Sequence, residues 1–247
     1  MVVTSTEVSS SKVIWHDLEC GSYRADLPLW RELAGAHDGP VLDIGAGTGR
    51  VALDLARAGH RVTALDLDID LLTALRDRAG HLDVEIVCAD ARLFDLDRSD
   101  FSLCLVPMQT IQLLDSSEQR IACLHRARAH LRPGGLIACA IVTALEPFDC
   151  ARGDLGPTPE TVRVGDMRYA SRATKVQAGR TTSIERERRT VGPGDQTVEE
   201  LDIVELARLT VPQLEREGTE TGLRAETAHE IPPTGDHVGS SVVMFRG

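Results

Sequence analysis

The sequence has few aromatic residues and little positive charge. Phe, Trp and Tyr make up 3% of its 247 residues, and 27 Lys and Arg stand against 38 Asp and Glu, a formal net charge of −11. Because binding a nucleic-acid backbone requires a basic surface, this balance argues against a nucleic-acid partner. The sequence also lacks a run of eighteen apolar residues and a basic start followed by an apolar segment. We therefore expect a cytoplasmic protein without a membrane partner.

The six cysteines show no Cys-x-x-Cys pair and no Cys/His cluster with metal-ligand spacing. Several of them lie within apolar runs, where a thiol behaves as a small hydrophobic group. The sequence also shows no cluster of acids near the fourth predicted strand that would hold Mg²⁺. We expect no disulfide framework and no metal site.

From residue 40 onward, short apolar runs alternate with longer amphipathic segments. Strands that are apolar along their length, separated by helices, are typical of a parallel sheet covered on both faces. We therefore predict a Rossmann-like α/β fold with a seven-stranded, mostly parallel sheet and helices on both faces. The predicted strands are 40–44, 61–65, 83–87, 100–106 and 135–142, followed later by 223–231 and 239–245; the predicted helices are about 48–58, 69–79, 117–131 and 210–221.

Two further regions flank or interrupt this pattern. Residues 1–39 contain two helical stretches broken near Gly21 and are predicted to form an N-terminal helical lid, with Asp26 capping the second helix. Residues 40–247 are predicted to form the main domain, with an antiparallel insert at about 155–207 built from short strands. The charged run at 185–189 in this insert is interpreted as the solvated edge of a strand.

A glycine-rich turn, VLDIGAGTGR, follows the first predicted strand at residues 41–50. Such turns let the backbone approach a nucleotide-like cofactor closely. A dinucleotide fingerprint would place the third glycine one residue later than Gly49. The carboxylate of Asp43 would repel a pyrophosphate but suits a ligand with an ammonium and a sulfonium, and S-adenosylmethionine carries both. Asp66, 21 residues after Gly45, is placed to accept hydrogen bonds from ribose hydroxyls.

Four stretches then occur in a familiar order: VLDIGAGTG, ALDLD, ADARLFDL and LRPGG. Over residues 40–142 the sequence resembles the class I S-adenosylmethionine-dependent methyltransferases, and its flanks resemble a bacterial small-molecule subgroup. The resemblance implies S-adenosylmethionine as cofactor, with the glycine loop at the methionine end, Asp66 at the ribose and Asp90 with Ala91 at the adenine. The segment after the fourth predicted strand, residues 107–110, would lie beside the reacting sulfur and the substrate. The residues that it assigns to cofactor binding are Gly45, Ala46, Gly47, Asp66, Leu67, Asp90, Ala91, Pro107, Met108 and Gln109.

Four residues outside these stretches are candidates for other roles. Trp15 and Tyr23 flank the break at Gly21 in a chain poor in aromatics, so we predict that they cover the cofactor, although packing alone would also explain them. His237, between the last two predicted strands, and Glu146, after the fifth, are the candidate proton acceptors. The alternative for His237 is a turn histidine bonded to backbone.

The sequence thus predicts methyl transfer from S-adenosylmethionine to an N, O or C nucleophile of a small molecule, in bacterial secondary metabolism. Peptide or protein methylation and cofactor binding without catalysis are the alternatives. The sequence leaves open whether the protein is a monomer or a homodimer.

Overall fold

The computed structural model describes the backbone of residues 5–235 and 237–247, and side chains from residue 11 onward. Contacts within the chain divide it into two compact units. Unit 1 comprises the segment up to Ser22 together with Ala144–Arg208, and unit 2 comprises Tyr23–Thr143 together with Leu209–Gly247. Within the part of the chain described, no helix is both long and apolar enough to cross a membrane.

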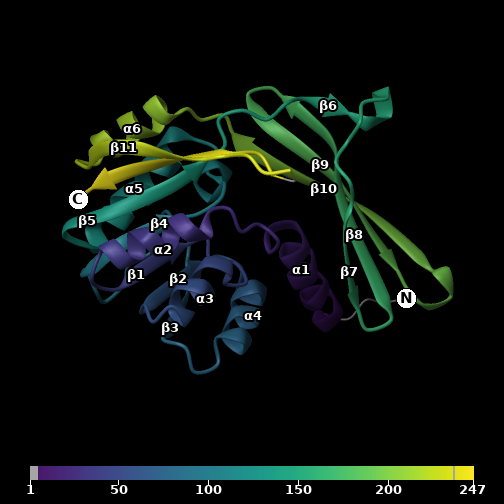
Figure 1. The fold of residues 1–247 in the computed structure, drawn as a ribbon, viewed down its shortest axis with the longest axis horizontal. Coiled ribbons are helices and arrows are strands. Elements are labelled where there is room, and N and C mark those ends of the chain that lie inside the picture. The colour runs from purple at the N-terminus through teal and green to yellow at the C-terminus, as the bar shows by residue number, and fades with distance from the viewer. Residues whose placement is uncertain (1–4, 236) are drawn as a thin grey trace. The chain divides into compact units, whose positions relative to one another are not determined.

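Unit 2 contains a seven-stranded sheet in the order β11-β12-β5-β4-β1-β2-β3 (Figure 1). Strands β1 to β5 run parallel, whereas β12 is antiparallel to both β5 and β11. This arrangement confirms the predicted Rossmann-like fold. The strands are β1 Val41–Ile44, β2 Val62–Asp66, β3 Val84–Cys88, β4 Phe101–Val106, β5 Leu131–Ile141, β11 Arg224–Ile231 and β12 Ser240–Arg246.

Helices cover both faces of this sheet because alternate side chains of each strand point to opposite faces. In β1, Val41 packs into the apolar cluster formed with α2, α3 and α4, whereas Leu42 and Ile44 pack into the cluster formed with η1, α5 and α6. Asp43 therefore points toward the α3 side. The helices are α2 Leu27–Ala36, α3 Arg50–Arg57, α4 Ile69–Ala79, η1 Thr110–Leu113, α5 Ser117–His130 and α6 Val211–Glu220.

Two local predictions in unit 2 were wrong. Asp26 occupies the residue before α2, but its side chain makes no capping hydrogen bond, because it binds Arg50 and Trp30 instead. The fifth strand was predicted to begin at residue 135, whereas β5 begins at Leu131 and includes the stretch 132–135. The pairing of β5 with β4 is irregular there, so the two glycines accommodate a shift in register within the strand.

Unit 1 combines α1, Ser5–Cys20, with an antiparallel sheet in the order β10-β9-β8-β6, and β7 also pairs with β8. The predicted antiparallel insert is therefore present, but its main strands are long rather than short. The predicted lid at residues 1–39 is divided, since α1 belongs to unit 1 and α2 to unit 2. The strands are β6 Phe148–Asp149, β7 Glu160–Val164, β8 Met167–Ala178, β9 Thr181–Val191 and β10 Thr197–Ala207; short 3₁₀ turns lie at Cys150–Arg152 and Pro193–Asp195.

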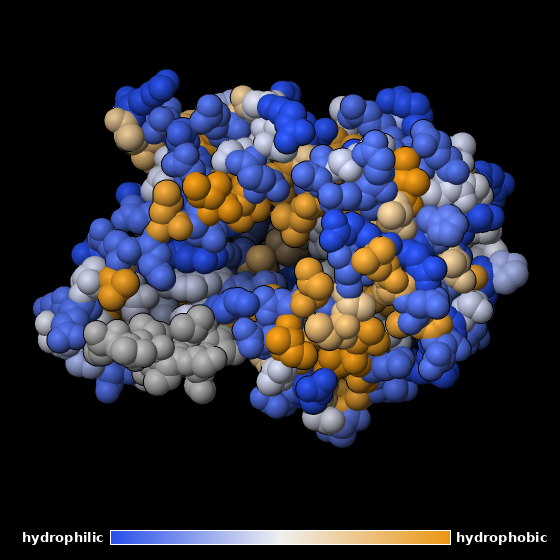
Figure 2. Space-filling view, turned by 180° about the vertical axis from the view of Figure 1, so that it is seen from behind, coloured by the Kyte–Doolittle hydropathy of each residue, from blue (hydrophilic) through white to orange (hydrophobic). Residues whose placement is uncertain are grey.

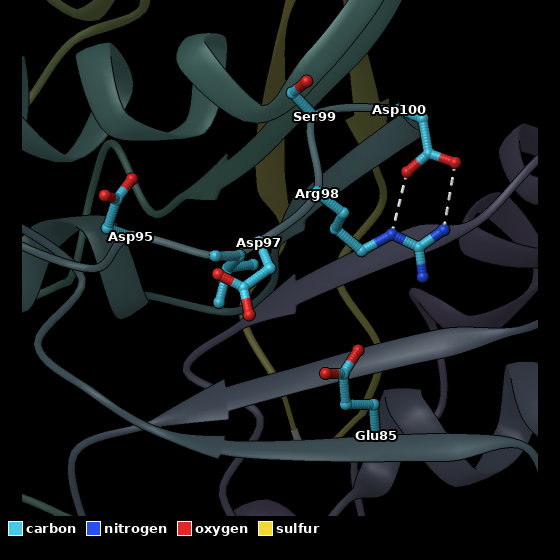
Figure 3. Close-up of a pocket in the computed structure, with 7 residues that line it drawn as sticks. Glu85, Asp95, Asp97, Arg98, Ser99 and Asp100 are labelled. Atoms are coloured by element: carbon cyan, nitrogen blue, oxygen red, sulfur yellow. Dashed lines mark hydrogen bonds and ion pairs between the residues drawn. The ribbon is translucent and has the colours of Figure 1, made fainter.

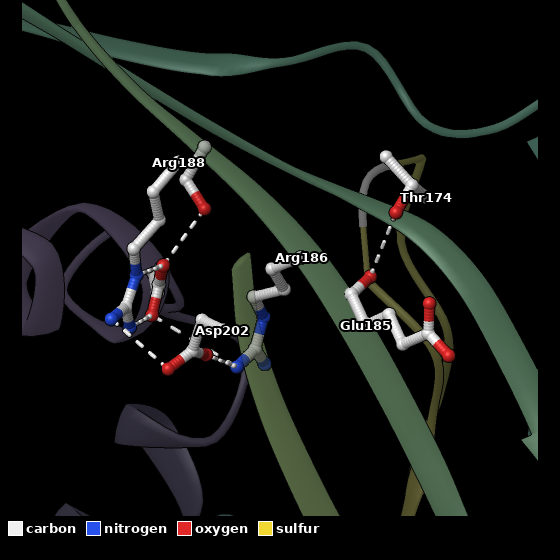
Figure 4. A network of polar contacts seen from close by, with 7 residues as sticks. Thr174, Glu185, Arg186, Arg188 and Asp202 are labelled. Carbon is white, nitrogen blue, oxygen red and sulfur yellow. Dashed lines mark hydrogen bonds and ion pairs between the residues drawn. The ribbon is translucent and has the colours of Figure 1, made fainter. Parts of the chain in front are cut away.

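The charged run at 185–189 does not form a sheet edge. It lies in β9, which is paired on one side with β10 and on the other with β8. Arg188 Nη2 lies 2.7 Å from Glu19 Oε2 of α1, and Arg188 Nη1 lies 3.0 Å from Asp202 Oδ1 of β10, which also pairs with Arg186 (Figure 4). The alternating arginines thus share one face of the sheet with acids of α1 and β10, a tertiary arrangement that the local pattern does not reveal.

The Glu19 cluster generates a prediction for stability. Burial acts to raise the pKa of Glu19, but hydrogen bonds from Arg188 and Ser171 and the charge of Arg186 bring it below its ordinary value. A lowered pKa means that the carboxylate stabilises the fold above about pH 4.5 and that this contribution disappears as pH falls through the folded-state pKa. Glu19→Gln should lower the free energy of unfolding by about 1–3 kcal/mol at pH 7, because it leaves Arg188 poorly paired.

Urea unfolding at pH 7 and pH 3.5 checks this expectation, and the difference from wild type should shrink at the lower pH. Glu187→Gln is the control, because Glu187 forms an exposed pair with Arg172 in the same sheet and should change stability by less than about 0.5 kcal/mol. Equal effects of the two substitutions would contradict the role of Glu19.

Candidate functional site

The candidate site lies where the parallel strands of unit 2 end. The carboxyl ends of neighbouring parallel strands meet at one edge of a sheet, and β1 pairs with both β2 and β4. The segments that the sequence assigned to cofactor binding all follow these ends: the glycine loop after β1, residues 66–67 at the end of β2, 90–91 after β3 and 107–109 after β4. Topology therefore brings together segments that lie far apart along the chain, from the loop at Gly45 to Gln109.

The conformation of the glycine loop requires residues without a Cβ atom. Gly45, Gly47 and Gly49 all have positive φ, at 77°, 54° and 92°, a region that other residues rarely adopt. A Cβ atom on Gly45 would lie 2.3 Å from Cγ2 of Thr110. The loop after β1 therefore packs directly against the Thr110 side chain of the segment after β4.

Asp66 is tied to the glycine loop. Its Oδ2 accepts a hydrogen bond from the Gly47 N–H at 2.7 Å, and its Oδ1 accepts one from the Asp68 N–H at 2.9 Å. Each carboxylate oxygen can accept a second hydrogen bond, so Asp66 keeps capacity for ribose hydroxyls. The next side chain, Leu67, is 68% exposed, as an apolar ligand surface would require. Across one face of the molecule, Figure 2 shows apolar residues, in orange, gathered in several patches among hydrophilic ones.

Asp43 is the most unusual group at this edge. It is 1% exposed, and neither of its carboxylate oxygens has a hydrogen-bond partner of normal geometry among the residues described. Burial raises the pKa of Asp43 to about 7, and the charge of Arg50 and the backbone N–H of Ala52 offset this shift only in part. A buried, unpaired carboxylate destabilises a fold unless a ligand or water satisfies it. Asp43 is therefore suited to a cationic ligand group.

A buried ion pair beside this loop was missed by the sequence interpretation. Arg50, the first residue of α3, donates to both oxygens of Asp26 at 2.6 Å and to the Tyr23 carbonyl at 3.0 Å. Trp30 Nε1 also donates to Asp26, at 2.8 Å. The available signal was an arginine directly after the third glycine, but nothing in the local pattern pairs it with an acid 24 residues earlier.

The structure brings two of the predicted residues together. The ring centroids of Tyr23 and His237 lie 5.0 Å apart, and the Arg50 guanidinium lies 5.3 Å from the Tyr23 ring centroid. His237 also closes a turn, because its N–H donates to Thr234 Oγ1 and its carbonyl accepts from the Thr234 N–H. His237 is therefore a turn histidine bonded to backbone, and its ring also contacts the ring of Tyr23.

Trp15 and Glu146 belong to unit 1. The Trp15 ring packs edge-on against Tyr169, with centroids 5.2 Å apart, and beneath the Arg188 guanidinium. These contacts account for its burial within unit 1, and a role of Trp15 in covering the cofactor stays a prediction. A role of Glu146 as a proton acceptor also stays a prediction.

Asp90 and Ala91 follow β3 as expected, but Asp90 already has a partner. Its carboxylate accepts hydrogen bonds from the Arg92 guanidinium and from the Arg92 backbone N–H, and these bonds lower the pKa of Asp90. Contact of Asp90 with adenine remains a prediction that would require sharing or displacing Arg92.

The segment after β4 carries local strain. Pro107 is buried, and Met108 has a φ of 54°, which is uncommon for a residue with a side chain and is concentrated at functional sites. Gln109 precedes η1, and within η1 the buried Gln112 exchanges two hydrogen bonds with the backbone of Val142, at 2.7 and 3.0 Å. Gln112, which sequence reasoning did not single out, anchors this strained segment to the end of β5.

A separate pocket of about 520 Å³ lies away from these residues. It is lined mainly by acids and by Arg98, which pairs with Asp100 (Figure 3). Glu85 is near the start of β3 and Asp100 precedes β4, so this pocket lies at the amino-terminal edge of the sheet. It is not part of the candidate site. In the described parts of the chain, no three His, Cys, Asp or Glu residues are grouped as metal ligands.

Comparison with known proteins identifies the domain. Residues 41–135 match the family model described as "Methyltransferase domain". This match begins at β1 and ends within β5, so it covers the glycine loop and the strand ends that carry the site. The predicted resemblance to class I S-adenosylmethionine-dependent methyltransferases is thereby confirmed.

Curated relatives match over the same half of the chain. A cypemycin N-terminal methyltransferase from Streptomyces sp is 36% identical over 133 residues, which cover 53% of each chain. A malonyl-[acyl-carrier protein] O-methyltransferase from Salmonella typhimurium is 34% identical over 111 residues, covering 43% of this chain and 40% of the relative. The aligned part thus spans about half the length, or less, of these relatives.

Solved structures are similar over nearly the whole length. DesVI from Streptomyces venezuelae covers 98% of this chain and 99% of its own with a TM-score of 0.69 and 21% identity. The sugar N-methyltransferase KedS8 from Streptoalloteichus sp covers 100% and 99% with a TM-score of 0.70 and 16% identity. At these identities the similarity establishes the fold.

The buried carboxylate of Asp43 generates a prediction for the ligand-free protein. The pKa of Asp43 is higher in the folded protein than in the unfolded chain. Between about pH 4 and 7 the folded protein therefore binds more protons than the unfolded chain does, and the free energy of unfolding falls as pH rises through that range. Asp43→Asn should therefore raise the free energy of unfolding by about 1–3 kcal/mol at pH 8, and by less at pH 5. Urea unfolding at both pH values measures this gain. Asp38→Asn, at an exposed acid, should change neither value, and a destabilised Asp43→Asn protein at pH 8 would refute the expectation.

Proposed function

We propose that this protein transfers the methyl group of S-adenosylmethionine to a nucleophilic atom of a small molecule. The observation that carries the proposal is the buried Asp43 carboxylate without a normal hydrogen bond, directly before a loop whose three glycines all have positive φ. An ammonium group would satisfy Asp43, and the combination of an acid with a close-approach loop fits the methionine end of this cofactor better than a pyrophosphate. The methyltransferase-domain match over residues 41–135 supports the same conclusion.

The remaining cofactor residues follow from the order of the strands. Gly45, Ala46 and Gly47 would hold the methionine end, Asp66 the ribose hydroxyls, and Leu67 with Asp90 and Ala91 the adenine. We propose that Pro107, Met108 and Gln109 lie beside the reacting sulfur, because their segment packs on the glycine loop through Thr110.

Chemically, the protein mainly has to orient the acceptor. S-adenosylmethionine supplies a methyl group on a positively charged sulfur, which is already a strong electrophile. The strained turn at Met108, held by the Gln112 bridge to Val142, gives a fixed backbone against which an acceptor can be aligned. Where the acceptor must lose a proton, His237 is the proposed proton acceptor, with Glu146 as the alternative.

The acceptor atom is N, O or C, and nitrogen is the first choice. The similar proteins named above include N-methyltransferases acting on a sugar and on a peptide terminus, alongside an O-methyltransferase. A small amine of bacterial secondary metabolism is therefore the proposed substrate class. Because a cypemycin N-terminal methyltransferase is 36% identical over half of the chain, a peptide amine is the second candidate.

Calorimetry tests the cofactor assignment. S-adenosylmethionine and S-adenosylhomocysteine should both bind, whereas NADH and NADPH should give no heat. Asp66→Ala should weaken S-adenosylhomocysteine binding by about 30- to 1000-fold, because charged hydrogen bonds to the ribose are lost. Asp38→Ala serves as the exposed control and should bind as wild type does. Tight NADH binding without S-adenosylhomocysteine binding would overturn the assignment.

Turnover tests the reaction class. The protein should form S-adenosylhomocysteine when it is given S-adenosylmethionine and a panel containing amino sugars, other small amines, peptides with free N-termini and carboxylic acids. Mass spectrometry of the acceptor identifies the methylated atom. Product from peptides alone would favour the second candidate, and binding without product from any acceptor would favour a non-catalytic role.

A further inference from the structure

Two ion pairs connect the start of unit 2 to helix α3, and they differ in their surroundings. Arg31 of α2 pairs with Asp54 in the second turn of α3, where the arginine side chain is 52% exposed. Asp26, just before α2, pairs with Arg50 at the first turn of α3, and these two side chains are 1% and 7% exposed. The buried pair adjoins the glycine loop, since Arg50 follows Gly49.

The buried Arg50–Asp26 pair also fixes the position of Tyr23. Besides binding Asp26 with two nitrogens, Arg50 donates to the Tyr23 carbonyl and lies 5.3 Å from the Tyr23 ring centroid. Its guanidinium thus fixes both the backbone and the ring of one residue. A planar guanidinium can make all these contacts at once, whereas the single ammonium of lysine cannot.

Tyr23 carries a buried hydroxyl group that a ligand atom could satisfy. Its hydroxyl is buried and, within the part of the chain described, lacks a hydrogen bond of normal geometry, with Ser240 as the neighbouring polar group. Its ring also contacts His237. An unpaired buried hydroxyl is unfavourable in an isolated fold, so a ligand atom is its natural partner.

Arg50 also acts on Asp43. The positive charge of Arg50 lowers the pKa of Asp43, whereas burial and the negative charges of Asp66 and Asp26 raise it. The Arg50 guanidinium therefore acts on two carboxylates, those of Asp26 and Asp43, and on the ring of Tyr23.

We propose that Arg50 is a positioning residue of the cofactor site, which holds Tyr23 in place beside the glycine loop. This inference rests on the proposed function, because it assumes that S-adenosylmethionine binds at that loop. Arg50 itself is already paired and needs no contact with the cofactor.

The test measures S-adenosylhomocysteine binding by calorimetry between pH 6 and 8, at a temperature well below unfolding. Arg50→Lys keeps the charge but loses the forked contacts, and should weaken binding by about 10- to 100-fold with little change in its pH dependence. Arg50→Met also removes the charge, so the midpoint of the pH dependence should move to higher pH. Arg31→Met, at the exposed pair between the same helices, should bind within about twofold of wild type.

Each outcome decides one question. Wild-type protein that fails to bind S-adenosylhomocysteine overturns the proposed function and this inference with it. If the wild-type protein binds S-adenosylhomocysteine and both Arg50 variants bind it with the same affinity and the same pH dependence, the inference fails and the proposed function stands. If the Arg50 variants do not fold, Tyr23→Leu replaces them, because it leaves the Arg50–Asp26 pair intact; the inference holds if this variant binds at least about tenfold more weakly and fails if it binds as wild type does.

Discussion

Parallel pairing of β1 with β2 and β4 is the constraint on which the site depends. It places the ends of three strands side by side, and each end is followed by a segment with one special requirement. After β1 the requirement is positive φ at three glycines, at the end of β2 a carboxylate that accepts a hydrogen bond from the Gly47 N–H, and after β4 a strained turn at Met108. If the register of β1 slipped by one residue, Asp43 would turn to the opposite face of the sheet, away from Arg50.

The energetics of this edge differ from those of the core. The two faces of the sheet are closed by apolar clusters, which supply most of the stabilisation. At the edge, by contrast, a carboxylate is buried without a normal hydrogen bond and a phenol hydroxyl is buried likewise. Such groups destabilise the ligand-free protein, so a ligand that satisfied them would be bound at the cost of stability in its absence.

Much of unit 2 could be predicted from the sequence, because apolar runs and helix periodicity are local signals. Helix α4 was expected at 69–79 and begins and ends there, and the glycine loop and Asp66 were placed by their spacing alone. Long-range pairs were not predictable. Asp26 has the position of a helix cap, and only the folded chain shows that Arg50 and Trp30 occupy its side chain. In unit 1, alternating charges resembled a solvated edge, although Glu19 and Asp202 neutralise them inside a sheet.

The order of strands has a consequence for synthesis on the ribosome. From Leu136 to Ile141, strand β5 is apolar and buried between β4 and β12, yet β12 follows the whole of unit 1 and α6 in the sequence. While residues 144–208 emerge, β5 is an uncovered edge of a sheet whose partner has not been made, which is the kind of surface that recruits other strands. The nascent chain therefore passes through an interval in which a largely apolar strand is exposed, and pairing with β12 ends that interval.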